Sequence, residues 1–334
     1  MRSKMLIVVV VTMLALGVAA RVGAAEKVIK FGDAVPKTYS YWPAMEEFKK
    51  VVEAKMGGSL KVELFGGGVL GDQKTLMTQT QAGAIQASVF VTTTSQALVP
   101  EHAVWGLPFL FKDTAAYKKF TYGPFGQELG TRLEKHGLKH LTWCYTGFLS
   151  IADSKNPIRK PEDLKGHKIR VMEDPMQIAT LKALGANAVG MPPAEVYPAL
   201  KQKVIDGVAT GPNFMLTLKA NEVAKYLSAT EHSATPCMII MNLAFWNSLS
   251  PAEQAALREG AIVFRDKNDY YHTDQPGTKE KDAYETWKQR GGTVESNIDL
   301  QAFRQATKPV IEEWKAKLGA DFVDRVLKET GYGN

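Results

Sequence analysis

The stretch that decides the fold is Leu164–Asn213, LKGHKIRVMEDPMQIATLKALGANAVGMPPAEVYPALKQKVIDGVATGPN. Short apolar runs alternate with helical segments in it, and the order strand, helix, strand, helix, strand predicts a parallel sheet. Asp174 and Pro175 suit a helix start, and a glycine at position 185 suits its end. The predicted elements are a strand at Lys168–Met172, a helix from Asp174 to Gly185, a strand at Asn187–Val189, a helix from Pro192 and Pro193, and a strand at Val204–Val208.

Arg170 lies inside the first of these predicted strands. Parallel strands are usually apolar on both faces, and an unpaired buried charge is very costly, so this arginine must meet an anion or solvent. Ligands of open α/β sheets bind at the carboxyl ends of the strands, which is where Arg170 falls. We therefore predict that Arg170 binds a ligand. The alternative is a structural salt bridge to Glu173 or Asp174.

Several longer motifs flank and fill this stretch. They are DLKGHKIRVMEDP, ALGANAVGMPPAEVYPAL and VIDG within it, EVAKY and Thr230–His232 after it, and GGGVLGDQKTLMTQTQAGAIQASV, PEHAVWGLPFLF and PIRKPEDLKG before or at its start. Together they resemble the periplasmic solute-binding proteins of TRAP transporters, the DctP family, over nearly the whole mature chain. The resemblance implies an α/β fold of two hinged domains, with a long helix spanning both. It also implies capture of a small organic acid for an ion-driven membrane permease, the TRAP permease membrane subunits.

Composition is that of a globular protein, with 334 residues, 45% hydrophobic and 23% charged. Residues 1–25 have a basic start, an apolar run too short to span a bilayer, and small residues up to Ala25, so we expect a signal peptide cleaved near Ala25 and a periplasmic protein. Its removal takes away Arg2, Lys4 and Arg21 and lowers the net charge from +6 to +3. A mildly basic surface suits an anionic solute and does not require nucleic acid as a partner.

The chain is expected to cross between the domains at least twice, because Pro236–Met241 is an apolar strand that leads back to the first domain. Ser250–Glu253 forms a capping box that begins a helical pattern reaching towards Lys288, which Pro276 and Gly277 bend or break. We expect C-terminal helices at Leu300–Leu318 and Ala320–Thr330. The expected division is residues 1–25 as signal peptide, 26–147 plus 236–275 as first α/β domain, and 148–235 plus 276–334 as second α/β domain.

The two cysteines, Cys144 and Cys237, belong to an exported chain and meet an oxidising compartment. The family fold implies that both lie on the segments that cross between domains and run side by side. We favour two unpaired buried thiols over a disulfide.

The resemblance also suggests which side chains touch the solute. The arginine of the K-I-R-V motif, Arg170 here, grips the carboxylate of the solute in the family. Relatives often carry a second arginine in a G-F-R motif, where this chain has Gly147, Phe148 and Leu149. Leucine in place of that arginine removes one positive charge from the expected binding site and adds apolar surface to it. We therefore expect a monocarboxylate with an apolar or neutral tail, rather than a dicarboxylate or an acidic sugar. The full set of candidate ligand-binding residues is Arg170, Leu149, Phe148, Thr210, Asn213, Thr92, Tyr39, Pro193 and Asp33.

The remaining candidate ligand-binding residues are chosen for different reasons. Thr210 and Asn213 replace the asparagine of the family's D-G-x-E-N-P motif, and Pro193 stands where many relatives have phenylalanine. Tyr39 and Thr92 follow predicted strand ends. Asp33 also follows a strand, and a loop cap is an equally good interpretation of it.

Other functional classes leave traces that we weigh against this interpretation. Gly66–Gly71 matches G-x-G-x-x-G and could serve an exported dinucleotide-dependent oxidoreductase. Asp72 would repel pyrophosphate at the following helix start, so we favour a tightly packed glycine turn and expect no cofactor. His136 and His140 are expected to be surface residues rather than metal ligands. No catalytic motif is evident, so we expect no enzyme. A solute sensor of the same fold remains an alternative to transport, and a monomer is favoured over a dimer that exchanges the long helix.

Overall fold

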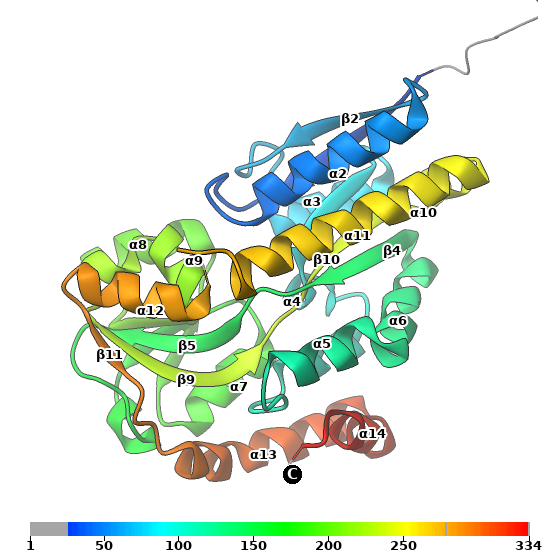
Figure 1. Ribbon diagram of the computed structural model, residues 1–334. Coiled ribbons are helices and arrows are strands. Elements are labelled where there is room, and N and C mark those ends of the chain that lie inside the picture. Colours follow the sequence, from blue (N-terminus) through cyan, green and yellow to red (C-terminus); the bar gives the residue numbers. More distant parts are fainter. Residues whose placement is uncertain (1–25, 278, 333–334) are drawn as a thin grey trace, which may run out of the picture.

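The structure, a computed structural model, describes residues 26–277 and 279–332, so the expected signal peptide lies outside the described residues. Two sheets with surrounding helices form two lobes (Figure 1). In the described part of the chain no helix is long and apolar enough to cross a membrane. The mixed α/β architecture expected from the sequence is confirmed.

The first lobe is built on a five-stranded sheet in the order β2-β1-β3-β10-β4. Strands β1, β2 and β3 are parallel, whereas β10 is antiparallel to both β3 and β4. The strands are β1 Lys27–Asp33, β2 Leu60–Phe65, β3 Ala87–Val91, β4 Leu138–Cys144 and β10 Cys237–Asn242. The helices are α2 Tyr41–Met56, α3 Gln73–Ala82, α4 Thr92–Ser95, α5 Thr114–Tyr122, α6 Pro124–Thr131, α10 Leu243–Asn247 and α11 Pro251–Thr273, with 3-10 helices η2 Pro100–Gly106 and η3 Arg132–His136.

The second lobe is built on a six-stranded sheet in the order β11-β9-β5-β8-β6-β7. Its strands are β5 Phe148–Asp153, β6 Lys168–Val171, β7 Asn187–Gly190, β8 Gly207–Thr210, β9 Tyr226–Ala234 and β11 Thr293–Glu295. Its helices are α7 Pro175–Ala183, α8 Pro193–Lys201, α9 Pro212–Thr217 and α12 Glu280–Gln289, with 3-10 helices η4 Pro161–Leu164 and η5 Ala220–Glu222. Strand β6 pairs in parallel with β7 and β8, so the predicted β-α-β-α-β unit is confirmed.

The third strand of this unit begins later than the sequence suggested. We expected Val204–Val208, but β8 starts at Gly207. The reason is the end of α8, where Lys203 has a positive φ of 59° and the backbone N–H of Val204 still donates to Ala199 O at 2.9 Å. Val204 thus lies at the end of α8, and its apolar side chain is 53% exposed instead of being buried in the sheet.

Helix α11 begins at the predicted capping box, where the Ser250 hydroxyl accepts from Glu253 N and the Glu253 carboxylate accepts from Ser250 N. It packs along α2 and β4, and points towards the second lobe, where α12 continues the path (Figure 1). The helical pattern breaks between Thr273 and Glu280, around the predicted Pro276 and Gly277. Gly277 has a positive φ of 84°, which glycine adopts without strain.

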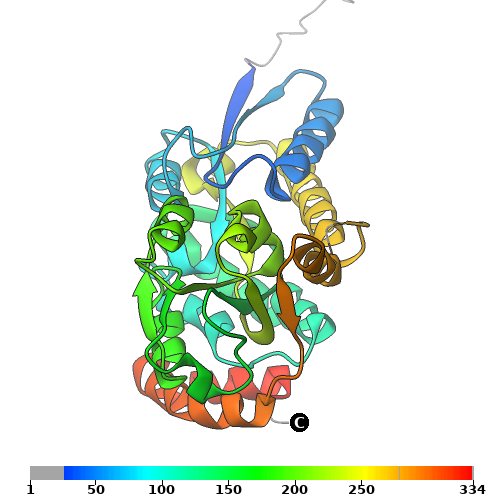
Figure 2. The same ribbon diagram turned by 90° about the vertical axis from the view of Figure 1, so that its left-hand side faces the viewer.

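Two C-terminal helices, α13 Leu300–Leu318 and α14 Ala320–Thr330, have the predicted bounds. They lie at the end of the molecule opposite α2 and β2 (Figure 2). Helix α13 packs on α7 of the second lobe, while α14 packs on α5 of the first. Val323 and Val326 accordingly share a core with Phe125 and Leu129. The C-terminal segment thus contacts both lobes, and the domain boundaries drawn from the sequence stay a prediction.

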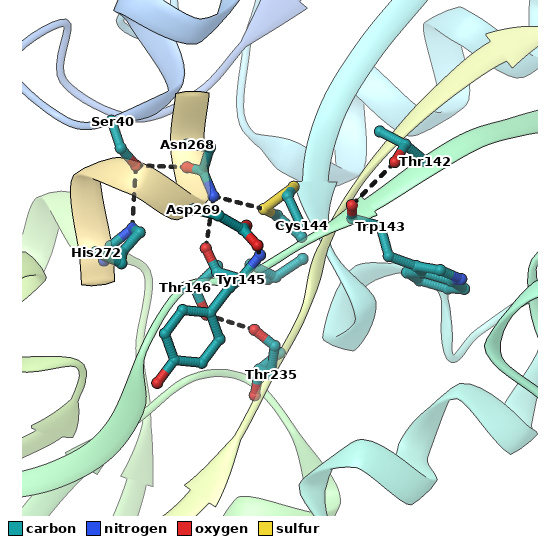
Figure 3. Close-up of a disulfide and its surroundings, with 12 residues drawn as sticks. Ser40, Thr142, Trp143, Cys144, Tyr145, Thr146, Thr235, Asn268, Asp269 and His272 are labelled. Carbon is teal, nitrogen blue, oxygen red and sulfur yellow. Dashed lines mark hydrogen bonds between the residues drawn. A yellow bond between two sulfur atoms is a disulfide. The ribbon is translucent and has the colours of Figure 1, made fainter. Parts of the chain in front are cut away.

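The two cysteines form a disulfide between β4 and β10 (Figure 3). Cys144 and Cys237 are register partners on neighbouring antiparallel strands, and their Cα atoms are 4.9 Å apart. That separation lies within the range a disulfide needs. The expectation of two unpaired thiols is therefore wrong. The family resemblance put the two segments side by side, but the residue-by-residue register between them was not visible in the sequence.

Beyond the disulfide, α11 holds the strand that enters the second lobe (Figure 3). The backbone N–H of Tyr145 donates to Asp269 Oδ1 at 3.0 Å, and the Asn268 amide donates to Tyr145 O at 2.6 Å. The Thr146 hydroxyl bonds to Thr235 O, which joins the two crossing segments directly. The hinge is therefore a pair of adjacent short segments, 145–147 between β4 and β5 and 235–236 between β9 and β10, and side chains of one long helix hold the first of them.

The glycine turn at Gly66–Gly71 and the residue His140, for which we expected no functional role, both have packing roles. A Cβ on Gly66 would lie 2.3 Å from the Trp42 ring, so the glycine turn exists because the chain passes tightly over that indole. Asp72 caps α3 by accepting from Thr75 N at 2.7 Å. His140 is not the surface residue we expected, because its ring is half-buried against Trp143 with centroids 4.3 Å apart. No group of residues able to hold a metal ion occurs in the described ranges.

Candidate functional site: a cleft between the lobes

A cavity of about 380 Å³ lies where the two lobes meet. Small-molecule sites typically measure roughly 300–1,000 Å³, so this one suits a small solute. Its wall includes residues at the carboxyl ends of β3, β6 and β8, where open α/β sheets bind ligands. The lining residues are Val35, Tyr39, Tyr41, Asp72, Gln73, Lys74, Met77, Val91, Thr93, Thr94 and Ala97 from the first lobe, Leu149, Arg170, Met172, Glu173, Met191, Pro192, Pro193, Thr210, Gly211 and Phe214 from the second, and Thr146 and Thr235 from the hinge.

Arg170 is the central polar group of this wall, and it is only 1% exposed. Its Nε and Nη2 both donate to the carbonyl oxygen of Met191, at 2.9 and 2.6 Å. Its Nη1 is buried and has no hydrogen-bond partner in the structure. The backbone after β7 thus fixes the plane of the guanidinium and leaves one edge ready for an acceptor.

The guanidinium forms no ion pair with any carboxylate of the described residues, so the structural salt bridge weighed above is absent. Asp174 instead caps α7, accepting from Met176 N at 2.9 Å. Burial lowers the pKa of Arg170 to about 10, and the charge of nearby Glu173 works in the opposite direction. Arg170 remains a cation at neutral pH, held in a site where a cation is costly without an anion.

Five of the residues singled out from the sequence line the cavity. These are Arg170, Leu149, Thr210, Tyr39 and Pro193. Leu149 is 3% exposed and belongs to β5, beside the hinge. Tyr39 meets Phe214 of the second lobe edge to face, with ring centroids 5.2 Å apart, so the back of the cavity is aromatic on both sides.

The other four singled-out residues, Phe148, Thr92, Asn213 and Asp33, do not line the cavity, and we do not propose them as ligand contacts. Side chains alternate along a strand, so Phe148 points away from Leu149 and into the core. Thr92 is buried where the chain turns into α4, and its two successors face the cavity instead. Asn213 is buried on α9.

Asp33 acts as a loop cap. Its Oδ1 accepts from Val35 N at 2.9 Å, while its Oδ2 is buried and has no partner in the structure. Burial raises the pKa of Asp33 to about 7, against the opposing effect of its backbone hydrogen bonds. The capping interpretation, left open by the sequence, is the one that this geometry supports.

Sequence reasoning missed the polar residues of the first-lobe wall, Gln73, Lys74, Thr93 and Thr94. Gln73 and Lys74 follow the glycine turn at the start of α3, and the threonines follow β3. A signal existed, because residues just after a strand or at a helix start commonly face a cleft. Two cations and two acids line the cavity, namely Arg170 and Lys74 against Asp72 and Glu173. Their formal charges cancel.

Two lobes joined by a pair of adjacent crossing segments, with a buried arginine that has no anionic partner in the cleft between them, define a solute-binding protein of the hinged type. The family model for bacterial extracellular solute-binding proteins, family 7 (DctP), matches residues 31–317. The chain therefore belongs to this family, the periplasmic solute-binding proteins of TRAP transporters.

Relatives agree over almost the full length. The 2,3-diketo-L-gulonate-binding periplasmic protein YiaO of Escherichia coli is 31% identical over 90% of this chain and 92% of its own. The C4-dicarboxylate-binding periplasmic protein DctP of Rhodobacter capsulatus is 29% identical over 96% of each chain. The crystal structure of a TRAP periplasmic solute-binding protein from Sulfitobacter sp. NAS-14.1 with bound β-D-galacturonate superposes with a TM-score of 0.84, at 30% identity, covering 91% of this chain and 99% of that one.

Proposed function

We propose that this protein captures a small organic acid in the periplasm, as a monomer, and delivers it to the membrane subunits of a TRAP permease. The observation that carries the proposal is Arg170, a buried cation whose Nη1 lacks a partner inside the cavity between the lobes. Family membership supports the transport role, and the acids named for its relatives support the class of solute.

A carboxylate supplies what Arg170 lacks. Guanidinium and carboxylate form charge-assisted hydrogen bonds, and each is worth roughly 1.5–3 kcal/mol net. The bound anion also offsets the cost of keeping the cation out of water. Because Arg170 belongs to the second lobe and the facing wall to the first, a solute that contacts both stabilises the closed arrangement.

We further propose a monocarboxylate over a dicarboxylate. Arg170 and Lys74 are the cationic side chains of the lining, and Asp72 and Glu173 balance them. Leu149 is buried and apolar beside the hinge, at the position where the family resemblance implies an arginine. A second carboxylate on the solute would therefore enter a site without a surplus of positive charge. Its desolvation would cost free energy that no further cation in the lining offsets.

The test is a thermal-shift screen followed by calorimetry. The screen uses D-galacturonate, pantoate, isovalerate, 2-oxoisovalerate and succinate as probes. Ligand at about 100 times Kd stabilises the folded state by about 2.7 kcal/mol, which raises the Tm readably. We expect monocarboxylates to give the largest shifts and Arg170→Ala to abolish them, while Arg159→Ala, on the surface of the same lobe, keeps them. Shifts that survive in Arg170→Ala, or succinate as the strongest probe, would contradict the proposal.

A further inference from the structure

We infer that Gln73 is a specificity-determining residue, which presents hydrogen-bond donors to an oxygen on the tail of the solute. The inference rests on the proposed function and refines it. It assigns the solute to the oxygenated monocarboxylates, those with a hydroxyl or oxo group beyond the carboxylate. Acidic sugars belong to this class, so the inference replaces the expectation from the sequence that disfavoured them, and it narrows the expected apolar or neutral tail to an oxygen-bearing one.

The orientation of the Gln73 amide is fixed by its surroundings. Its Oε1 accepts from the backbone N–H of Val91 at 3.1 Å and from the Thr94 hydroxyl at 3.1 Å. A backbone N–H can only donate, so the amide atom that faces Val91 has to be the oxygen. The amide nitrogen, with its two hydrogens, must then point away from β3.

Gln73 is half-buried and lines the cavity from the first lobe, at the first turn of α3. Within the described chain no hydrogen bond involves its Nε2, and that atom is not among the fully buried unpaired ones. The donors therefore remain available to a molecule in the cavity. An acceptor oxygen is the group that satisfies them.

Two neighbours of Gln73, Lys74 and Thr93, also line this wall and can donate, whereas Thr94 spends its only hydroxyl hydrogen on Gln73 Oε1 and Asp72 is an acceptor. The opposite wall is different. Apart from Arg170, Glu173 and Thr210, it consists of apolar side chains and glycine, namely Leu149, Met172, Met191, Pro192, Pro193, Gly211 and Phe214. A solute anchored by its carboxylate on Arg170 thus turns its oxygen-bearing side towards the first lobe.

This arrangement couples specificity to closure. Arg170 and Gln73 lie on different lobes, so only a solute with both a carboxylate and a tail oxygen bridges them through strong hydrogen bonds. A deoxygenated acid of the same size would fill the cavity but leave the Gln73 amide without an acceptor, which costs binding free energy.

The test compares Gln73→Met and Gln73→Glu with the wild type. Methionine keeps the length of the side chain and removes the donors. Glutamate can still accept from Val91 N and Thr94 Oγ1, so it preserves the local fold, but places a carboxylate oxygen where the donors were. Gln81→Met, an exposed glutamine on the same helix that does not line the cavity, is the matched control.

Calorimetry with D-galacturonate and with cyclohexanecarboxylate, which has the same ring size without the oxygens, supplies the readout. The wild type is expected to prefer D-galacturonate, and Gln73→Met to weaken that acid about tenfold, the equivalent of roughly 1.4 kcal/mol, with cyclohexanecarboxylate little changed. Gln73→Glu should weaken D-galacturonate at least as much, and Gln81→Met should change neither acid.

The outcomes separate the two levels of the proposal. If the wild type binds neither acid nor any acid of the screen above, the proposed function fails and this inference fails with it. If the wild type binds acids through Arg170 but does not prefer the oxygenated one, or if Gln73→Met retains the preference, the inference about Gln73 alone is overturned.

Discussion

Replacing both Cys144 and Cys237 by alanine, or reducing the bond between them, should destabilise the protein strongly. The cysteines are 93 positions apart. In the chain-entropy model, a crosslink that closes a loop of this length stabilises the fold by about 4.6 kcal/mol at 25 °C, since it restricts the unfolded chain. With an unfolding entropy of about 2.1 cal/mol/K per residue, the expected fall in Tm is about 7 °C. Affinity for the solute should stay nearly unchanged, because neither cysteine lines the cavity.

The assay is thermal unfolding of the wild type and the double alanine variant, each with and without dithiothreitol. The wild type should lose several degrees in reductant, and the variant should be indifferent to reductant and as unstable as the reduced wild type. Mass spectrometry under denaturing conditions confirms the redox state. A wild type that is verifiably reduced and yet unfolds at the same temperature as the oxidised protein would refute the reasoning.

Two further predictions concern pH and the glycine turn. Acidification from pH 6 to 5 should lower the free energy of unfolding by roughly 2–3 kcal/mol per pH unit. Burial lowers the pKa of His102 and His232 to about 4 and that of His140 and His272 to about 3, so these four side chains gain protons only on unfolding. Burial raises the pKa of Asp33 to about 7 and that of Asp174 to about 6, so these two lose protons on unfolding and offset part of the effect. Urea midpoints measured at both pH values check this, and a midpoint that rises on acidification would contradict it. Gly66→Ala should destabilise the fold by about 1–3 kcal/mol, because its Cβ would lie 2.3 Å from the Trp42 ring. Gly190 is exposed and has no positive φ, and a Cβ there would meet its nearest neighbour at 3.4 Å, so Gly190→Ala should cost less. Equal urea midpoints for the two alanine variants would count against the packing role of the turn.

Several helix starts in both lobes could be predicted because they are defined locally. Asp174 and Pro175 begin α7, and the capping box at Ser250 begins α11, since each start depends on residues within one turn. Strand β8 begins at Gly207 and not at Val204, because Val204 belongs to the turn that follows α8. Hydrophobic periodicity alone could not distinguish this turn residue from the first residue of a strand.

The site was only partly predictable for a related reason. Arg170 stands out because a charge in an apolar strand is conspicuous. The disulfide, by contrast, depends on the pairing of strands far apart in sequence. The first-lobe wall depends on which of three successive threonines faces inward. Gln73 becomes informative only once Val91 and Thr94 are seen to fix its amide.

The most direct measurement is a crystal structure of the protein with the tightest-binding acid from the screen. The account predicts that a carboxylate oxygen of that acid lies within about 3 Å of Arg170 Nη1, with the contacts from Nε and Nη2 to Met191 O retained. A solute whose carboxylate is held elsewhere, with Arg170 Nη1 bound to a side chain of the protein itself, would contradict it.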